Sequence, residues 1–547
     1  MTRALQSLTF ETTSDTCLLH TDNLIMSYDI ILRGGSIVDG TGSPAIQADL
    51  AINHNRIAEI GNLADAPATS EIDVSGLVVA PGFIDTHNHS DGWVTQTSGQ
   101  ECKIAQGITT ELLMSDGISY APVNDDTWRE WIYYLHSLDG LNMHQYGGWY
   151  SLQEYMEFAA GRSHQNIITQ VPYANVRSLA CGWSRNRVDD VQMRAIQREI
   201  RVGMEQGATG VSTGLDYVLQ CFSDTDELAE ACSVLNDFNG IYVTHVRYKK
   251  GLIPAINEAI EICTRAGCRL HISHLKGHDP YPPEVVLGRL EEAANDGLDI
   301  AFDVYPYQCG STMLNYLLPY TVWEDGPTAA MKHITTPSFE REFEQILDDY
   351  RLDLDKVIIA WTALNDFESS WGQTLNEYVQ STGQSTGRAL IDLLIDNNLA
   401  VLCVVDEGDD HHVHPYLQHP MCMFGTDAIE MPNGKVHPRA FGSSARMIGR
   451  MVRDEKLFSL EEAVRKMTSF PAEWFGIEKR GQLKKDWFAD LVVFDEQTVI
   501  DNATYKSPRQ NPDGIRLSIV NGAVVYQDGA VIKHDDAPGK YLRCGVE

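Results

Sequence analysis

A repeated unit in the middle of the chain constrains the fold more than any other feature. In one copy, residues 191–205 carry apolar side chains at helical spacing, Gly207 ends the pattern, and residues 209–212 follow as a strand. A second copy runs from the helical stretch 253–266 into the strand 270–273. Alternating helices and strands of this kind predict an α/β fold with a TIM-like (β/α)8 barrel, in which chemistry takes place at the carboxyl ends of the strands.

Both ends of the chain have a sequence pattern that differs from that of the middle. Short strands separated by glycine turns recur from Tyr28 to Gly61, and residues 489–495 and 518–525 repeat this pattern near the other end. Each set is too small to bury a good core alone, so one small β-sandwich built from both termini is favoured over two separate terminal domains.

Four parts are therefore expected along the chain. Residues 1–25 are polar and patternless, and the region 279–351 is longer than one barrel repeat requires. The expected parts are an N-terminal extension over 1–27, expected to be disordered, the first part of the sandwich over 28–82, the barrel over 83–475 with an insertion or lid around 279–351, and the second part of the sandwich with the C-terminal tail over 476–547.

The charge balance excludes some classes of partner. A net charge of −34 argues against nucleic acid and against an anionic membrane surface. No apolar run reaches the ~20 residues of a membrane helix, and the N-terminus lacks a signal-peptide pattern. The 11 cysteines include no Cys-x-x-Cys pair and are expected to be reduced. A cytoplasmic protein is the default expectation, and the oligomeric state stays open.

Two histidines separated by one residue stand near the start of the predicted barrel. The apolar pair at 83–84 follows a Pro-Gly break and leads into His87 and His89. Residues i and i+2 of an extended strand point to the same face, so the two imidazoles project together. A bare His-x-His is more often a pair of loop histidines, but two imidazoles at a strand end also make half of a transition-metal site.

Other titratable residues follow predicted strands elsewhere in the middle region. Residues 241–244 run into His245, residues 270–273 into His274, residues 423–426 into Asp427, and residues 109–115 into Asp116. A single histidine after a strand is usually a hydrogen-bonded structural residue. Several such residues at one rim of one barrel favour a metal centre instead.

These residues carry a resemblance to a known family. The stretch 81–91 resembles the first-strand signature of the amidohydrolase superfamily, and the wider set is similar to its N-acyl-D-amino-acid deacylase (D-aminoacylase) branch. The matching pieces, which follow one another in order within about residues 28–530, are residues 107–110, 117–122, 211–215, 245–247, 272–276, 305–307, 310–312, 425–427, 437–442, 464–468 and 489–494.

The resemblance implies a metal-dependent hydrolase of small-molecule amides. It implies that His87 and His89 hold one, weaker metal ion and that His245 and His274 hold a tighter Zn²⁺. Asp427 would then touch the metal and act as general base and acid. Lys276, Tyr305, Ser311 and Arg439 match positions that hold the carboxylate and the carbonyl of the substrate.

Asp116 departs from the family pattern, which has a cysteine ligand at this position. A carboxylate also ligates or bridges divalent metals, so Asp116 is expected to be a metal ligand. A carboxylate oxygen is, however, a chemically harder ligand than a thiolate sulfur. The leading hypothesis is cleavage of N-acyl-D-amino acids. The loop 427–437 and the pair at 443–444 also differ from the family, which keeps a cyclic amide, imide or natural-product amide as the alternative substrate. A catalytically inactive barrel used for binding is a third, less favoured hypothesis.

Overall fold

The computed structural model describes residues 27–96, 101–277, 280–350 and 352–545, and within them the predicted barrel is confirmed. Its wall is closed between the last and the first strand, where the backbone N–H of Asp427 donates to His87 O at 2.7 Å. The strands, all parallel, are β6 (Phe83–Asp85), β7 (Ile108–Leu112), β8 (Asn166–Ile168) continued by β9 (Val171–Pro172), β10 (Gly210–Gly214), β11 (Ile241–His245), β12 (Arg269–Ile272), β13 (Ile300–Val304) and β17 (Cys422–Phe424).

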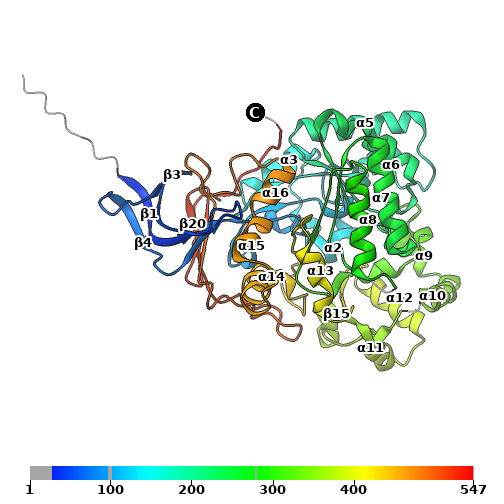
Figure 1. The fold of residues 1–547 in the computed structure, drawn as a ribbon. Helices are drawn as coiled ribbons and strands as arrows, with labels where there is room; N and C mark the ends of the chain where they lie inside the picture. The colour runs from blue at the N-terminus through cyan, green and yellow to red at the C-terminus, as the bar shows by residue number, and fades with distance from the viewer. Residues whose placement is uncertain (1–26, 97–100, 278–279, 351, 546–547) are drawn as a thin grey trace, which may run out of the picture.

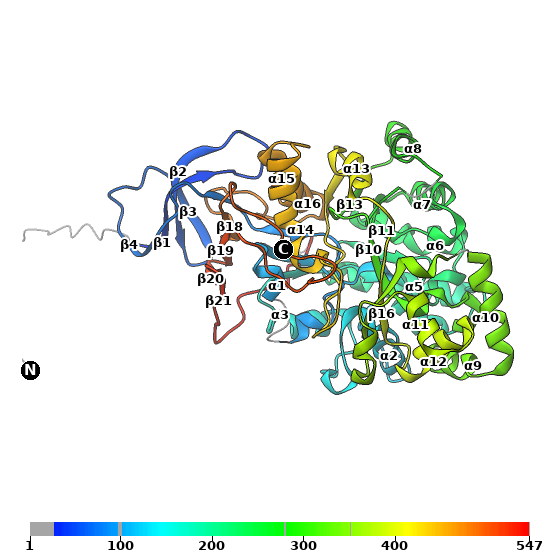
Figure 2. The ribbon, with the colours of Figure 1, turned by 90° about the horizontal axis from the view of Figure 1, so that it is seen from below.

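Helices cover the outside of the barrel (Figures 1 and 2). In α5 the side chain of Asp189 caps the first turn by accepting from Val191 N and Gln192 N, and Ile196 and Ile200 are fully buried beneath the helix. Burial of each isoleucine contributes about 1.5–3 kcal/mol. The outer helices are α4 (Tyr173–Cys181), α5 (Asp190–Glu205), α6 (Thr225–Cys232), α7 (Leu252–Ala266), α8 (Pro283–Asn295) and α15 (Leu460–Met467).

The barrel interior is packed at the end opposite the histidines. Side chains from the strands, among them Ile84, Leu112 and Val243, form one buried cluster with Trp474 and Phe475 of α16 (Ser469–Phe475). The barrel is therefore open at the carboxyl ends of its strands. The remaining helices of the barrel region are α1 (Glu101–Ile104), α2 (Trp128–Asp139), α3 (Leu152–Ala160), α14 (Arg439–Arg446) and the π-helix η12 (Met447–Asp454).

Strands from the two ends of the described chain form a single sheet, at the left of Figure 1. β5 pairs antiparallel with β18, with Ala80 opposite Val492 and Val79 opposite Val493. The sheet runs in the order β21 (Ala530–Val531), β20 (Ala523–Gln527), β19 (Ile515–Val520), β18 (Leu491–Phe494), β5 (Val78–Pro81), β1 (Tyr28–Ile37), β2 (Ile46–Asn53) and β3 (Arg56–Gly61), and β4 (Ala68–Asp73) also pairs with β1. Of the expected extension over 1–27, all but the last residue lies outside the described residues.

A long segment separates the last two barrel strands in sequence. Within the stretch expected to form an insertion, 279–351, α8 and β13 belong to the barrel itself, and the inserted segment runs from residue 305 to 421. It contains an antiparallel sheet in the order β14 (Gly310–Met313), β16 (Val401–Val405) and β15 (Val357–Thr362). Its helices are α9 (Pro327–Ile334), α10 (Pro337–Tyr350), α11 (Leu375–Thr382), α12 (Thr386–Asp396) and α13 (His414–Gln418).

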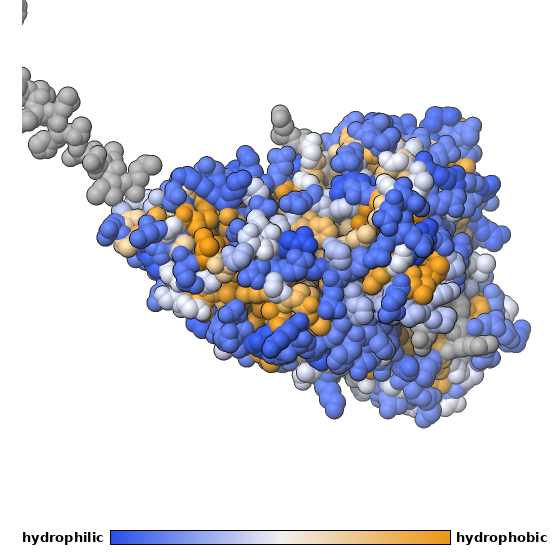
Figure 3. Space-filling view, viewed as in Figure 1, coloured by the Kyte–Doolittle hydropathy of each residue, from blue (hydrophilic) through white to orange (hydrophobic). Residues whose placement is uncertain are grey.

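The face of the molecule in Figure 3 is mainly hydrophilic, with its larger hydrophobic patches in the left half, where the sheet from both chain ends lies, and smaller ones to the right of centre. Among the described residues, no helix combines the length and the apolar character that crossing a membrane requires. The ten described cysteines are all free thiols, eight of them buried, which agrees with the expectation of reduced cysteines.

Candidate metal centre

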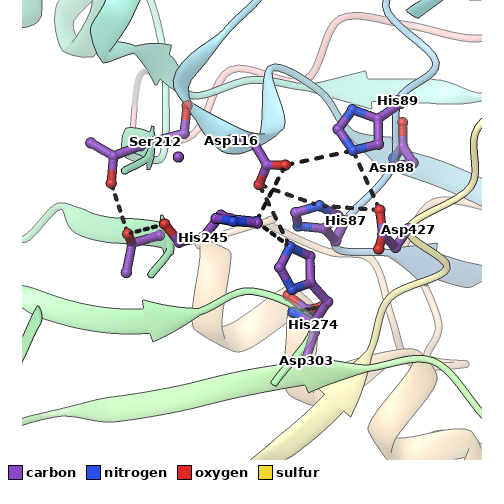
Figure 4. A network of polar contacts seen from close by, with 12 residues as sticks. His87, Asn88, His89, Asp116, Ser212, His245, His274, Asp303 and Asp427 are labelled. Carbon is purple, nitrogen blue, oxygen red and sulfur yellow. Dashed lines mark hydrogen bonds and ion pairs between the residues drawn. The ribbon is translucent and has the colours of Figure 1, made fainter. Parts of the chain in front are cut away.

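The six residues expected to hold metal converge at the open end of the barrel (Figure 4). They come from five different strand ends, as the alternating pattern predicts. His87 and His89 follow β6, Asp116 lies in the turn after β7, His245 ends β11, His274 follows β12 by two residues, and Asp427 follows β17 by three.

Asp116 lies at the centre of this group. Its Oδ1 is 3.6 Å from His87 Nε2 and 3.8 Å from His274 Nε2, and its Oδ2 is 3.7 Å from His89 Nε2. Asp427 Oδ1 lies 3.3 Å from His89 Nε2 and 3.7 Å from His87 Nε2. Two ligand atoms bound at ~2.0–2.1 Å to one tetrahedral zinc ion stand about 3.4 Å apart. The observed spacings are close to this value.

Several donor atoms of the group have no hydrogen-bond partner. Both ring nitrogens of His87 and Oδ1 of Asp116 are buried and make no hydrogen bond, and the same is true of His245 Nε2. A buried polar atom without a partner costs about 1–3 kcal/mol. Imidazole nitrogens and carboxylate oxygens are ligands of Zn²⁺. The residues present therefore fit one or two zinc ions, which would satisfy Nε2 of His87 and Oδ1 of Asp116.

The backbone is strained at three of these residues. Asp116, His274 and Asp427 have φ of 58°, 38° and 49°, in the left-handed region that residues other than glycine rarely adopt. Such conformations cost about 1–3 kcal/mol each and occur mostly at functional sites. The strain aims the three side chains at one point above the barrel.

The electrostatic environment favours the ligand forms of His87 and Asp116, and a proton on His89. Burial lowers the pKa of His87 to about 4, in spite of Asp116, so this imidazole is neutral at pH 7. Burial would raise the pKa of Asp116, but His87, His274 and His245 hold it well below its usual range. Burial opposes a charge on His89 as well, yet Asp139 and Asp427 raise its pKa to about 10. A bound cation replaces such a proton.

Three carboxylates that contact the histidines, two at the ring and Asp303 at the backbone, are absent from the set predicted from the sequence. Asp139 Oδ1 lies 3.2 Å from His89 Nδ1, Asp216 Oδ2 lies 3.7 Å from His245 Nε2, and Asp303 accepts from the backbone N–H of His274 at 2.8 Å. Carboxylates behind metal-binding histidines fix the ring orientation. A strand-end position marks Asp303 and Asp216 in the sequence, whereas Asp139 ends a helix and has no such signal.

A cavity of about 540 Å³ opens above the group. Lys276, Tyr305 and Ser311 line it, as expected for substrate-binding residues. Lys276 Nζ donates to Tyr305 Oη at 2.8 Å and to Glu407 Oε2 at 2.8 Å, and Glu407 is a further lining residue that the sequence did not reveal. Ser311 Oγ donates to the backbone oxygen of Cys403.

Arg439 lies behind the cavity wall and is completely buried. Its Nη1 is 2.8 Å from Asp427 Oδ2, and its guanidinium lies over the ring of Tyr305, 4.5 Å from the centroid. Burial would raise the pKa of Asp427, but Arg439, and after it His89, His274 and His87, keep it well below its usual range. Asp427 is therefore anionic at neutral pH.

The cavity also has an apolar lining. Its wall includes side chains from α7, the segment after β14 and the start of β15, so the inserted segment contributes much of it. A pocket that combines charged and apolar lining residues suits an amphiphilic small molecule. The apolar lining consists of Leu252, Met313, Leu314, Leu317, Leu352 and Val357.

Known proteins resemble this chain over nearly its whole length. The sequence profile of the amidohydrolase family matches residues 70–367 and 416–526. The D-aminoacylase of Alcaligenes xylosoxydans xylosoxydans is 32% identical over 510 residues, which cover 92% of this chain and 95% of the relative. The N-acyl-D-glutamate deacylase of the same organism is 33% identical over 522 residues, covering 94% and 96%.

A solved structure shows the same arrangement of the chain. The N-acyl-D-glutamate deacylase of Bordetella bronchiseptica, complexed with zinc and a phosphonate inhibitor that mimics the tetrahedral intermediate of the reaction, superposes with a TM-score of 0.80 at 30% identity. The superposition covers 95% of this chain and 100% of that one. With the profile match and the barrel described above, the chain belongs to the amidohydrolase family, in its D-aminoacylase branch.

Proposed function

We propose that this protein is a zinc-dependent amidohydrolase that cleaves the amide bond of N-acyl-D-amino acids, giving a carboxylic acid and a free D-amino acid. One observation carries the proposal: four histidines and two aspartates converge around unpartnered buried donor atoms at the floor of a cavity. The relatives named D-aminoacylase and N-acyl-D-glutamate deacylase support the choice of substrate.

In this proposal His87, His89, Asp116, His245, His274 and Asp427 hold the metal. Asp116 lies between both histidine pairs, so it would hold metal together with either pair. Bound zinc supplies Lewis acidity, which lowers the pKa of water to ~7 and polarises the amide carbonyl.

Asp427 is the general base and then the general acid of the proposal. Its carboxylate is anionic and borders the cavity, so it can take a proton from the attacking water and deliver it to the leaving amine. Its left-handed backbone points the carboxylate at the metal ligands. Its low pKa makes Asp427 a weak base for free water, so in this proposal it would take a proton only from water whose pKa has been lowered at the occupied site.

Arg439 and Lys276 supply the positive charge for an anionic substrate. Lys276, Tyr305 and Ser311 line the cavity and form its polar wall. Arg439 lies behind this wall and is completely buried, so the proposal requires the wall to move before the guanidinium binds the substrate carboxylate in a fixed, forked geometry. The apolar part of the cavity then accepts the acyl group or an uncharged side chain.

A hydrolysis screen with zinc-reconstituted protein tests this function. The panel contains N-acetyl-D-amino acids, their L enantiomers, and cyclic amides and imides, and the same protein treated with a chelator is the control. We expect free amino acid from the D substrates and none after chelation. Turnover of the cyclic compounds alone would establish the alternative substrate class, and zinc binding without turnover of any class would favour a binding protein.

A further inference from the structure

A second group of metal-binding side chains lies outside the cavity. His411 belongs to the short helix η11 (Asp410–Val413), His414 begins α13, and Glu455 caps the end of the π-helix η12. One donor atom from each lies within 4.8 Å of the other two. None of the three residues lines the cavity of the candidate metal centre.

The contacts within this group leave the donor atoms facing one another. His414 Nε2 lies 3.2 Å from Glu455 Oε2, and the rings of His411 and His414 have centroids 4.8 Å apart at 59°. The two rings are tilted relative to each other rather than stacked. Two imidazoles bound to one ion have such a tilted arrangement. The carboxylate approaches from a different part of the chain, so three donors meet from three elements.

In His411 and Glu455, the second polar atom of the side chain contacts a neighbouring side chain. His411 Nδ1 lies 2.5 Å from Asp409 Oδ1, which leaves Nε2 of this ring as its other donor. Arg450 Nε donates to Glu455 Oε1 at 2.8 Å, which leaves Oε2 toward His414. A carboxylate behind a metal-binding histidine and a hydrogen bond behind a metal-binding carboxylate are the usual outer contacts of metal sites.

The donor set selects the class of ion. Two imidazole nitrogens and one carboxylate oxygen suit Zn²⁺ and Cu²⁺, whereas Ca²⁺ and Mg²⁺ require oxygen ligands. The side chain of His411 is 63% exposed, and those of His414 and Glu455 are 13% and 21% exposed. An ion therefore reaches the group from solvent and completes its coordination with water.

We propose that His411, His414 and Glu455 form a surface site for a divalent transition-metal ion, separate from the candidate metal centre. The occupied site ties the segment after β16 to the end of η12. In that segment Asp410 accepts from the backbone N–H of Gln308 at 2.8 Å, and Glu407 accepts from Lys276. An ion at the surface site thus braces a wall of the cavity from outside.

Equilibrium dialysis of the zinc-loaded protein against rising zinc concentrations tests the site, with bound zinc measured by elemental analysis. We expect the wild type to take up one equivalent more than His411→Ala, and Glu455→Gln to lose the same equivalent. Asp409→Asn keeps every ligand and is expected to weaken this binding step about 10- to 100-fold. Electron paramagnetic resonance of Cu²⁺ added to the zinc-loaded protein is expected to show coupling to two nitrogen ligands.

His412 provides the matched control, because it is an exposed histidine next to His411 that takes no part in the group. His412→Ala is expected to bind as much zinc as the wild type. Equal zinc uptake by wild type and His411→Ala would overturn the proposal. Equal losses in His411→Ala and His412→Ala would overturn it as well, because binding would then follow the number of exposed histidines. Both substitutions are at exposed side chains, so folding is preserved, and a thermal melt of each variant verifies it.

Discussion

Arg439 and Asp427 form a buried ion pair at the candidate metal centre, with Nη1 2.8 Å from Oδ2. The proposed function assigns the same guanidinium to the carboxylate of the substrate. A bound substrate therefore shares the positive charge that now lowers the pKa of Asp427. Sharing weakens this effect, so substrate binding raises the basicity of Asp427 at the moment when a base is needed.

Replacing Arg439 by lysine tests the binding half of this arrangement. The point charge of lysine replaces a planar fork that also lies over Tyr305. Loss of one charge-assisted hydrogen bond of about 1.5–3 kcal/mol predicts a fall of roughly 10- to 100-fold in kcat/KM, carried mostly by a higher KM. Steady-state kinetics on an N-acyl-D-amino acid measure it. An unchanged KM would remove Arg439 from substrate binding.

Replacing Asp427 by asparagine tests the catalytic half. The amide keeps the shape of the side chain but accepts no proton, so kcat is expected to fall about 10²- to 10⁴-fold. Five other ligands remain in the group, so zinc content by elemental analysis is expected to stay close to that of the wild type. Turnover within tenfold of the wild type would show that another group moves the proton.

Removing the carboxylate of Asp116 tests the centre of the metal site. Asp116→Ala deletes the group that faces all four histidines, so zinc affinity is expected to fall at least 10-fold in competition with a chromophoric chelator. Asp116→Cys restores a ligand of softer character and is expected to recover tight zinc binding. A Co²⁺-loaded cysteine variant should then show a sulfur-to-metal absorption band. Unchanged affinity in Asp116→Ala would make this residue a bystander.

Glu430 gives the protein a specific dependence of stability on pH. Burial raises its pKa to about 7, against opposing effects from Cys102 and Arg509. Between pH 4.5 and 7 the folded state keeps a proton that the unfolded state has lost, so the free energy of unfolding falls as pH rises through this window. The total change is about 3 kcal/mol.

Urea unfolding of wild type and Glu430→Gln at pH 5 and at pH 8 measures this effect. Other groups titrate in both proteins, so the difference between the two isolates Glu430. We expect the wild type to lose stability relative to the variant between the two pH values, because glutamine cannot ionise. A difference that is the same at both pH values would contradict the prediction.

The sequence was sufficient for the parts of the molecule that follow from local pattern. The period-two spacing of His87 and His89, and the strand-end positions of His245 and His274, predicted their common location, because parallel strands bring their carboxyl ends to one rim. The sequence also predicted that strands from both chain ends would come together in a small β-sandwich, since neither terminal fragment buries a sufficient core alone; the single sheet and its β5–β18 pairing were not part of that prediction.

Contacts between distant segments were not predictable in this way. Glu407 meets Lys276 across 131 positions, and Asp139 meets His89 across 50, so no spacing rule connects them. The length of the insertion was also hidden, because α8 and β13 within the stretch 279–351 have the same pattern as any other barrel unit. Its true extent follows only from the pairing of β13 with β17.

The pairing of β5 with β18 also sets the order in which the chain reaches its final form. During synthesis one edge of β5 stays unpaired until residues 491–494 are made, more than 400 positions later, while the strand that leads to His87 begins two residues after β5. Closing so long a loop is entropically slow. The first two of the proposed zinc ligands to leave the ribosome are thus among the last residues to be fixed in place, and an ion is expected to enter only a chain that is nearly complete.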